Sequence, residues 1–239
     1  MPSEETPAEG PRRGAIDRRR FLALGAGALA AGLAGCQSGP PVVAETVTEP
    51  LAAPRAGDTW RYRYVSGWPQ IPSRDFSVTV TQTAPNGIVD SLSAAGFAAQ
   101  TQLWTGTLAF VPRPLGGFAV TEFSPYIMAF VRLATGQVWY NIPLPSGAAP
   151  LTPWSAEARV RGLDAVTVPA GTFDAVRVDL NGFRRGPGVA PSADTAQLSA
   201  TAWYAPAVRR VVRFRHQTWT LTMLPIDNDG YELLEYKPA

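Results

Sequence analysis

The sequence predicts an all-β fold: a single antiparallel domain built as a strongly curved sheet, a sandwich or a half-open barrel. Three observations favour this fold class. Apolar and polar residues alternate in many short runs, with the period of two that a half-buried strand requires. Glycine and proline, with 22 and 23 residues, separate these runs. Apolar residues recur at the spacing of a helix in only one segment, so the pattern indicates antiparallel strands rather than alternating strands and helices.

The first predicted strands begin after residue 57. Trp60, Tyr62 and Tyr64 alternate with arginines, and residues 75–82 alternate again through Phe76. A Pro-Asn-Gly turn then separates this strand from an apolar pair. Further short strands are expected at residues 97–104, 107–111 and 118–123. The segment in which a helix competes is residues 124–133, where Tyr126, Ile127, Phe130 and Leu133 recur at helical spacing.

The second half of the chain carries the sharpest local signature, residues 166–178. Pro169 suits the second position of a type I turn, and Gly171 follows at the fourth position, where a left-handed conformation favours glycine. We expect Val166 and Val168 to pair with the strand that begins near Phe173. The strands predicted in this half are residues 156–168, 173–180, 196–204, 208–220 and 231–236.

A polar tetrapeptide, Asp-Asn-Asp-Gly at residues 227–230, has two interpretations. Because Asp-Gly is a preferred turn pair, a hairpin turn between Leu224 and Tyr231 is the favoured one. The alternative is weak calcium binding. In the register of an EF-hand, however, the first and twelfth ligand positions fall on Pro225 and Tyr236, which cannot supply the required carboxylates.

The N-terminal residues predict an export signal. An arginine cluster precedes an apolar run of about 15 residues, shorter than the ~20 that a membrane-spanning helix needs, and small residues precede the single cysteine. Leu33-Ala34-Gly35-Cys36 resembles a lipobox, in which the cysteine thiol is acylated and becomes the new N-terminus. The export motif, which resembles a twin-arginine signal except at Asp17 and Ala23, is formed by Arg18, Arg19, Arg20, Phe21 and Leu22.

These features divide the chain into three parts. Residues 1–35 are the predicted signal peptide, residues 36–56 a lipidated N-terminus and flexible tether, and residues 57–239 the β domain. The predicted location is the cell envelope, on the periplasmic face of a membrane to which the acyl groups, palmitate among them, anchor the protein. The outer membrane is favoured in a diderm, because Gln37 and not aspartate follows Cys36. With Cys36 acylated, no disulfide is expected.

Four segments together resemble an exported bacterial lipoprotein family of unknown function. They are residues 57–62, a Val-Pro-Ala-Gly-Thr-Phe-Asp-Ala-Val-Arg-Val hairpin at 168–178, a Trp-Tyr-Ala-Pro strand at 203–208, and residues 231–236. The resemblance implies a curved antiparallel sheet, similar in fold to the outer-membrane lipoprotein carriers, and no established activity. The chain departs from the family at Ala207 and the arginines after it, where relatives commonly have glycine.

Enzyme chemistry finds little support in the sequence. The single histidine, His216, lies within a predicted strand and shares a face with Val212 and Phe214, which favours a packed side chain over a catalytic base. The sequence contains no Gly-x-Ser-x-Gly elbow and no phosphate-binding glycine loop. One histidine and one acylated cysteine do not suffice for zinc. We therefore predict no catalytic residue, no metal and no cofactor.

Charge and aromatic content suggest binding instead. The formal net charge is only +2, so no nucleic-acid partner is expected. Guanidinium groups on and before one strand suit phosphate or carboxylate, as in lipid headgroups or acidic glycans, although a solvated strand face is the alternative. The candidate contacts are Arg209, Arg210, Arg213 and Arg215. The seven tryptophans are expected mostly in the core, but a concave sheet lined by aromatic rings could hold an acyl chain or a sugar.

Three functional hypotheses follow. The favoured one is a non-catalytic, membrane-anchored lipoprotein of the cell envelope that binds a protein partner or an apolar or glycan ligand. The second is a lipid or lipoprotein carrier in the periplasm, which requires an empty apolar cavity. The third is an envelope hydrolase, which requires a cleft with two facing carboxylates, one of them with a raised pKa.

Overall fold

The computed structural model describes residues 53–116, 118–127, 130, 133–144, 154–184 and 196–239. Every described residue belongs to one compact unit of the chain. The predicted export motif, Cys36 and most of the predicted tether therefore lie outside the described residues, and these assignments stay predictions.

The described residues form twelve strands and one short 3-10 turn, η2 (Pro206–Val208). In the first half of the chain the strands are β1 (Thr59–Ser66), β2 (Arg74–Ala84), β3 (Gly87–Ser93), β4 (Gln100–Trp104), β5 (Phe110–Leu115) and β6 (Phe118–Phe123). In the second half they are β7 (Val138–Leu144), β8 (Trp154–Val168), β9 (Gly171–Arg184), β10 (Ala196–Ala205), β11 (Arg210–Thr220) and β12 (Pro225–Lys237). The all-β prediction is confirmed.

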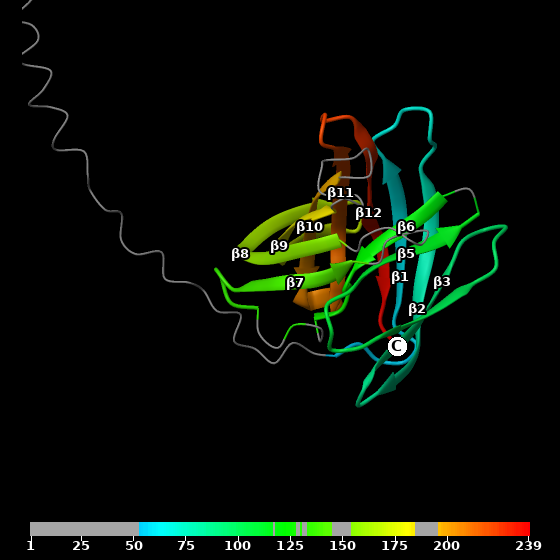
Figure 1. Ribbon diagram of the computed structural model, residues 1–239. Helices are drawn as coiled ribbons and strands as arrows, with labels where there is room; N and C mark the ends of the chain where they lie inside the picture. Colours follow the sequence, from blue (N-terminus) through cyan, green and yellow to red (C-terminus); the bar gives the residue numbers. More distant parts are fainter. Residues whose placement is uncertain (1–52, 117, 128–129, 131–132, 145–153, 185–195) are drawn as a thin grey trace, which may run out of the picture. The chain divides into compact units, whose positions relative to one another are not determined.

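Ten strands form one antiparallel sheet in the order β4-β3-β2-β1-β12-β11-β10-β9-β8-β7, and β5 pairs with β6 in a second, two-stranded sheet. The last strand, β12, lies between β1 and β11 and so joins the two halves of the chain. Figure 1 shows the β5–β6 hairpin lying across the large sheet, with β8 and β9 curving strongly. In the described residues the edge strands β4 and β7 do not pair with each other, so the sheet is not closed into a barrel.

Bulges account for much of the curvature. Register shifts interrupt six of the strand pairings, among them β8–β9 between Val160 and Gly162 and β10–β11 between Trp203 and Tyr204. An extra residue on one strand bends that strand and increases its twist. Gly162 has a φ of +124°, which only glycine adopts without strain.

The core lies between the two sheets and is rich in aromatic rings. On β1, Trp60 and Tyr62 are fully buried and Tyr64 nearly so, as the alternation with arginine predicts. The ring of Tyr62 stacks on Phe76 at 5.3 Å and meets Tyr231 edge-on at 5.0 Å. Aromatic pairs at these distances add stabilisation beyond the burial of their area, so the concave face of the large sheet is filled by side chains.

The predicted β8–β9 hairpin is confirmed. Val166 pairs with Phe173 and Val168 with Gly171, which leaves Pro169 and the following alanine as the turn. Gly171 has a φ of +134°, as its position after a type I turn requires.

The predicted turn at residues 227–230 is wrong, because these residues lie inside β12. The turn instead spans Thr220 to Leu224, where the amide of Thr220 donates to the carbonyl of Leu224 at 2.9 Å. Cross-strand partners on β11 hold the polar tetrapeptide in extended form: Gln217 bonds Asn228, and Thr218 bonds Asp227. Such pairs stabilise a sheet and outweigh the turn preference of Asp-Gly.

The structure also differs from the sequence predictions in the middle of the chain. The strand predicted at 107–111 begins later, as β5, and contains two prolines, which an edge strand tolerates. β7, with Tyr140 exposed, was not predicted. In the segment where a helix competes, Tyr126 forms an isolated antiparallel bridge with Arg210. Residues 128–129 and 131–132 lie outside the described residues.

Candidate binding site

The structure does not place the four arginines on the single contact surface predicted for them, although Arg213 and Arg215 stay together. Arg209 pairs with Asp58 at 3.1 Å, and both Arg213 and Arg215 pair with Glu232, at 3.1 and 3.2 Å. Arg215 is 63% exposed and is available to a ligand. Arg210, by contrast, has no exposed surface, which removes it from any contact with a headgroup.

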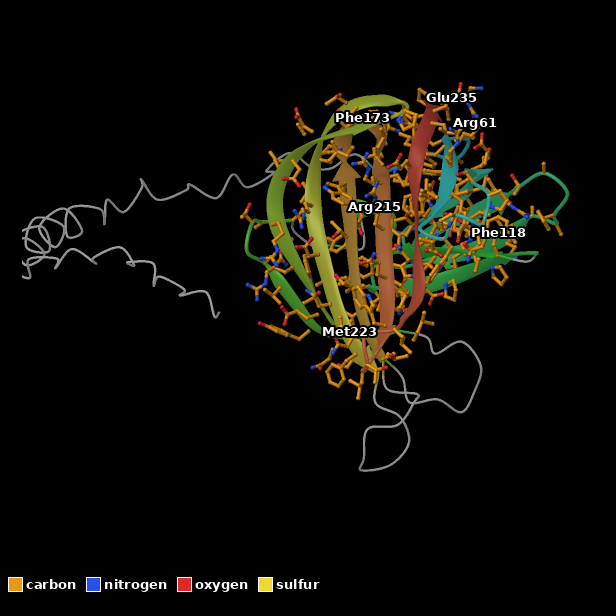
Figure 2. All side chains as sticks on the ribbon, turned by 90° about the horizontal axis from the view of Figure 1, so that it is seen from above. Arg61, Phe118, Phe173, Arg215, Met223 and Glu235 are labelled. Carbon is orange, nitrogen blue, oxygen red and sulfur yellow. The ribbon has the colours of Figure 1, made fainter. Side chains whose placement is uncertain are left out.

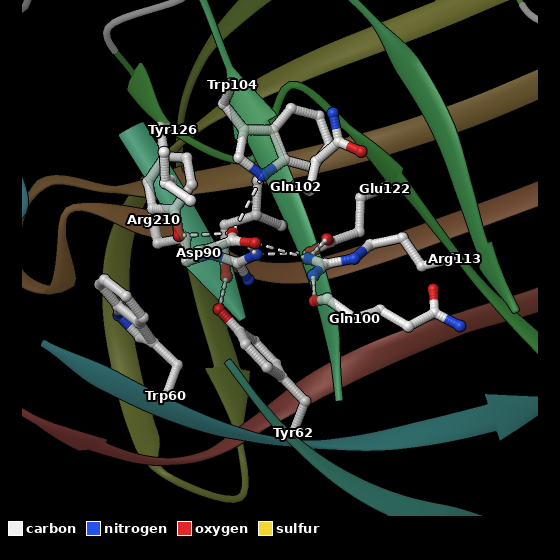
Figure 3. A network of polar contacts seen from close by, with 12 residues as sticks. Trp60, Tyr62, Asp90, Gln100, Gln102, Trp104, Arg113, Glu122, Tyr126 and Arg210 are labelled. Atoms are coloured by element: carbon white, nitrogen blue, oxygen red, sulfur yellow. Dashed lines mark hydrogen bonds and ion pairs between the residues drawn. The ribbon is translucent and has the colours of Figure 1, made fainter. Parts of the chain in front are cut away.

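Arg210 instead belongs to a buried charge cluster, which consists of Asp90, Arg113, Glu122 and Arg210 (Figure 3). Nη1 of Arg113 lies 2.8 Å from Oδ1 of Asp90 and 2.9 Å from Oε2 of Glu122. Nη2 of Arg210 lies 2.5 Å from Oε1 of Glu122 and 3.7 Å from Oδ2 of Asp90. Two positive and two negative groups thus balance within the core.

Neutral donors and aromatic rings complete this cluster. Oδ2 of Asp90 accepts hydrogen bonds from the indole of Trp104 at 2.9 Å and from the hydroxyl of Tyr126 at 2.8 Å. The guanidinium of Arg210 lies over three rings, with Cζ 5.5 Å from the centre of Trp60, 5.2 Å from Tyr62 and 5.0 Å from Tyr126. Cation–π attraction strengthens when the partners are desolvated, so the rings offset part of the cost of burying this charge.

The two carboxyls of the charge cluster differ in pKa. Burial raises the pKa of Glu122, but the charges of Arg210 and Arg113 outweigh burial and hold it below its ordinary value. Burial, and then the charge of Glu122, raise the pKa of Asp90, because its own contacts with the arginines only partly offset them. The pair resembles the carboxylates that a hydrolase needs, yet both are inaccessible. It therefore offers no cleft for a substrate and acts as a structural link between the sheets.

An open cavity of about 500 Å³ lies between the small sheet and one end of the large sheet; we call it the rim cavity. Apolar and polar side chains share its wall. Its lining residues are Tyr64, Gln70, Ile71, Pro72, Arg74, Pro112, Phe118, Ala119, Thr121, His216, Asp227 and Asp229. A second cavity, of about 390 Å³, lies over β10, β11 and β12 and also includes His216 and Asp229.

His216 is fixed at the wall of the rim cavity. Its Nδ1 lies 2.7 Å from Oδ1 of Asp229, and the hydroxyl of Tyr64 donates to Oδ2 of the same carboxylate at 3.0 Å. Burial, and then the charge of Asp229, hold the pKa of Tyr64 well above its ordinary value, so the phenol stays a donor. The rings of Phe110 and Phe214 pack on the imidazole, each at 5.8 Å.

Arg74 also lines this cavity. Its guanidinium lies 4.9 Å from the ring centre of Phe118 and 6.0 Å from that of Phe97. The rim cavity therefore offers a cation held on an aromatic surface and, on β12, carboxylates. Within the described ranges, no group of three or more His, Cys, Asp or Glu side chains is arranged to hold a metal ion.

Sequence reasoning missed the charge cluster, although a signal for it is present. Asp90 lies in phase with the buried residues Ile88 and Leu92 on β3, and Glu122 lies in phase with Val120 on β6. A charged residue at an inward position of a strand requires a buried partner. The rim cavity has no comparable signal, because its wall combines strands that are distant in sequence.

The chain matches no protein-family model, and no curated protein matches it. Two solved structures show a weak likeness. One is a protein from Bacteroides fragilis described as exported and as having a YmcC-like fold, with 13% identity over 77% of this chain and 97% of that chain, at a TM-score of 0.39. The other is a protein from Parabacteroides distasonis described as a lipoprotein, with 15% identity over 78% and 98%, at a TM-score of 0.42. At such scores neither likeness carries an argument.

Proposed function

We propose that the protein is a non-catalytic, membrane-anchored lipoprotein of the cell envelope whose β domain binds a ligand in the rim cavity. The observation that carries this proposal is the composition of the cavity wall. A volume of about 500 Å³ lies within the range of small-molecule sites. Tyr64 and Phe118 present aromatic rings to it, while Arg74 and Asp227 present charges.

This combination favours a ligand with both an apolar face and polar groups, as a glycan has. An aromatic ring packs against an apolar face, while carboxylate and guanidinium groups bond hydroxyls or charges at its edge. A purely apolar acyl chain would displace water from the charges of the wall without offering them hydrogen bonds in return, at a cost in binding free energy. Since the concave face is filled by aromatic side chains, a glycan-like ligand fits better than the cargo of a lipid carrier.

The absence of catalysis is part of the proposal and rests on His216. An imidazole held by a carboxylate activates a protein nucleophile only if a hydroxyl or thiol lies beside it. In the part of the chain that the structure describes, no serine or threonine hydroxyl is bonded to His216. The imidazole contacts Asp229 and two phenyl rings instead, which suits a binding wall.

Anchorage follows from the sequence and is proposed with the binding function. Acylation of Cys36 would hold the β domain at a membrane surface, since two or more acyl chains give stable attachment. The residues after Cys36 would then separate the domain from the bilayer. Among the described residues no helix is long and apolar enough to span a membrane.

Native mass spectrometry of the mature protein, extracted from host membranes in detergent, tests the binding function. We expect a non-covalent adduct on the wild type that is absent from Thr121→Trp, whose indole would fill the rim cavity. The matched control is Thr83→Trp, an exposed position on β2 outside the cavity. An adduct that survives Thr121→Trp, or no adduct after incubation with an envelope glycan extract, would refute the proposed site. Bound phospholipid would instead support a lipid carrier.

A further inference from the structure

Exposed apolar side chains gather at one end of the β domain. They are Ile71 in the β1–β2 loop and Leu221, Met223, Leu224 and Ile226 at the end of the β11–β12 hairpin, which together we call the apolar tip. Met223 and Leu224 are 62% and 63% exposed. Exposed apolar residues that gather at one end of a domain mark an interaction surface, whereas scattered single ones need no explanation.

The two loops belong to the same end of the molecule. Ser66, at the end of β1, pairs with Asp229, close to the hairpin turn, and the amide of Gly67 donates to the carbonyl of Asn228 at 2.6 Å. In Figure 1 the cyan β1–β2 loop and the orange β11–β12 turn lie at the same end. Figure 2 shows Met223 at one end, with Arg61 and Glu235 at the other.

We propose that the apolar tip inserts into the bilayer that carries the lipid anchor. The first support is its lack of charge. From His216 to Ile226 the chain contains no Asp, Glu, Lys or Arg, so the turn can enter the headgroup region without desolvating a formal charge, the main cost of placing polar residues in a membrane. Trp219 and Trp68, both partly buried, lie next to these loops, and tryptophan favours the membrane interface.

The second support is the internal hydrogen bonding of the turn. The amides of Thr220 and Met223 donate to the carbonyls of Leu224 and Thr220, at 2.9 and 3.0 Å. The amide of Leu224 donates to the hydroxyl of Thr220 at 3.1 Å, and that hydroxyl also lies 2.9 Å from the hydroxyl of Thr222. Backbone that enters a bilayer must satisfy its polar groups internally. In this turn the amides of Thr220, Met223 and Leu224 are bonded in this way, while the apolar side chains are exposed.

The third support is the predicted acylation of Cys36, which would keep the β domain near a bilayer. The inference therefore rests on the anchorage in the proposed function. β1 begins beside the C-terminus, since Thr59 pairs with Lys237, and the tip lies at the opposite end of β12. The 13 residues of β12 extend over about 40 Å. The predicted tether, residues 37–56, could extend to about 70 Å. Anchor and tip can therefore reach one bilayer, and tethering raises the effective concentration of the tip there.

Insertion would place the rim cavity at the membrane surface, because Ile71 belongs both to the apolar tip and to the cavity wall. A ligand would then be held next to the lipid headgroups. A flat apolar face would suit a protein partner equally well, whereas an exposed hairpin turn without formal charges suits a lipid surface.

Depth-dependent fluorescence quenching tests the inference. Because the chain has one cysteine, Met223→Cys supplies the only free thiol in acylated protein. An environment-sensitive dye is attached at this position, and the protein is mixed with vesicles of phosphatidylethanolamine and phosphatidylglycerol. The emission of the dye should shift to the blue, and spin-labelled lipids should quench it several-fold more than the same dye at Asp174→Cys. Asp174 is an exposed site after the β8–β9 turn. Equal quenching at the two sites would overturn the inference.

Substitution gives a second measurement. Serine at Leu221, Met223 and Leu224 should abolish the blue shift of Trp219 and Trp68 on vesicle binding. Serine at Leu103, Tyr140 and Leu163, which are equally exposed elsewhere, should leave it unchanged, and loss in both variants would contradict the inference. Acylation is measured separately. If Cys36 is not acylated, the anchorage is refuted. The dye-labelled Met223→Cys and Asp174→Cys chains are then prepared with Cys36→Ser and titrated with excess vesicles. A blue shift of the dye at position 223 alone would still support insertion of the apolar tip, and its absence would overturn it.

Discussion

The guanidinium of Arg210 on β11 and the carboxylate of Glu122 on β6 form an ion pair of 2.5 Å with no exposed surface on either side chain. The pair joins the large sheet to the small one. Burying it costs desolvation free energy, which the second ion pair, two neutral donors and three aromatic rings offset. This contact fixes the position of the β5–β6 hairpin and thereby one wall of the rim cavity.

Replacing Glu122 by glutamine is expected to lower the free energy of unfolding by about 3–5 kcal/mol, because Arg210 would stay buried with less counter-charge. Urea unfolding followed by tryptophan fluorescence measures the change. The matched control is Glu235→Gln, since that carboxylate forms ion pairs with Arg61 and Lys237 at the surface. Exposed pairs contribute up to about 1 kcal/mol. Equal losses in the two variants would contradict a special role for the buried pair.

The turn of the β8–β9 hairpin supplies a second prediction. Gly171 has a φ of +134°, and a Cβ there would meet nothing within 4 Å, so the cost of Gly171→Ala lies in the backbone alone. We expect a loss of about 1 kcal/mol. Gly106→Ala, also free of neighbours but without a positive φ, should be close to neutral. An unchanged thermal midpoint for Gly171→Ala would refute the strain at this position.

Asp58 supplies a pH-dependent prediction. Burial raises the pKa of its carboxyl, but hydrogen bonds from the amides of Arg55 and Ala239, together with Arg209, outweigh burial and hold the pKa below its ordinary value. The folded state thus favours the ionised form. Its contribution is complete above the unfolded pKa of about 3.9 and is lost as the pH falls through the folded value.

Asp58→Asn should therefore lower the free energy of unfolding by about 1–3 kcal/mol at pH 7, and the gap to the wild type should narrow below pH 4. Urea unfolding at pH 7 and pH 3 measures both. If the two proteins differed by the same free energy of unfolding at both pH values, the ionised form of Asp58 would not be what stabilises the contact between the start of the domain and its C-terminus.

Alternation and turn chemistry predicted most of the strands, because each depends on neighbouring residues. Trp60, Tyr62 and the Pro169 turn are examples. The charge cluster was not predicted, since it joins Asp90, Glu122 and Arg210 across large sequence separations, and only their inward phase indicates burial. Arg210 shows the limit most clearly. It follows an arginine in the sequence and resembles a surface residue, yet aromatic rings and two carboxylates enclose it.

The export route gives a further prediction. Arg18, Arg19 and Arg20 resemble the twin-arginine signal. Replacing all three by lysine keeps the charge but removes the guanidinium groups, so export should stop and uncleaved precursor should accumulate in the cytoplasm. Fractionation and immunoblotting measure this. Continued export would assign the chain to the general secretion route.

The intact mass of the protein extracted from host membranes decides whether Cys36 carries a lipid anchor. We expect a chain that begins at Cys36 and carries the added mass of diacylglycerol with or without a third acyl chain. Cys36→Ser should lack this mass and leave the membrane fraction. An unmodified Cys36 in membrane-bound wild-type protein, or a chain that retains residues 1–35, would rule out lipid anchorage at Cys36.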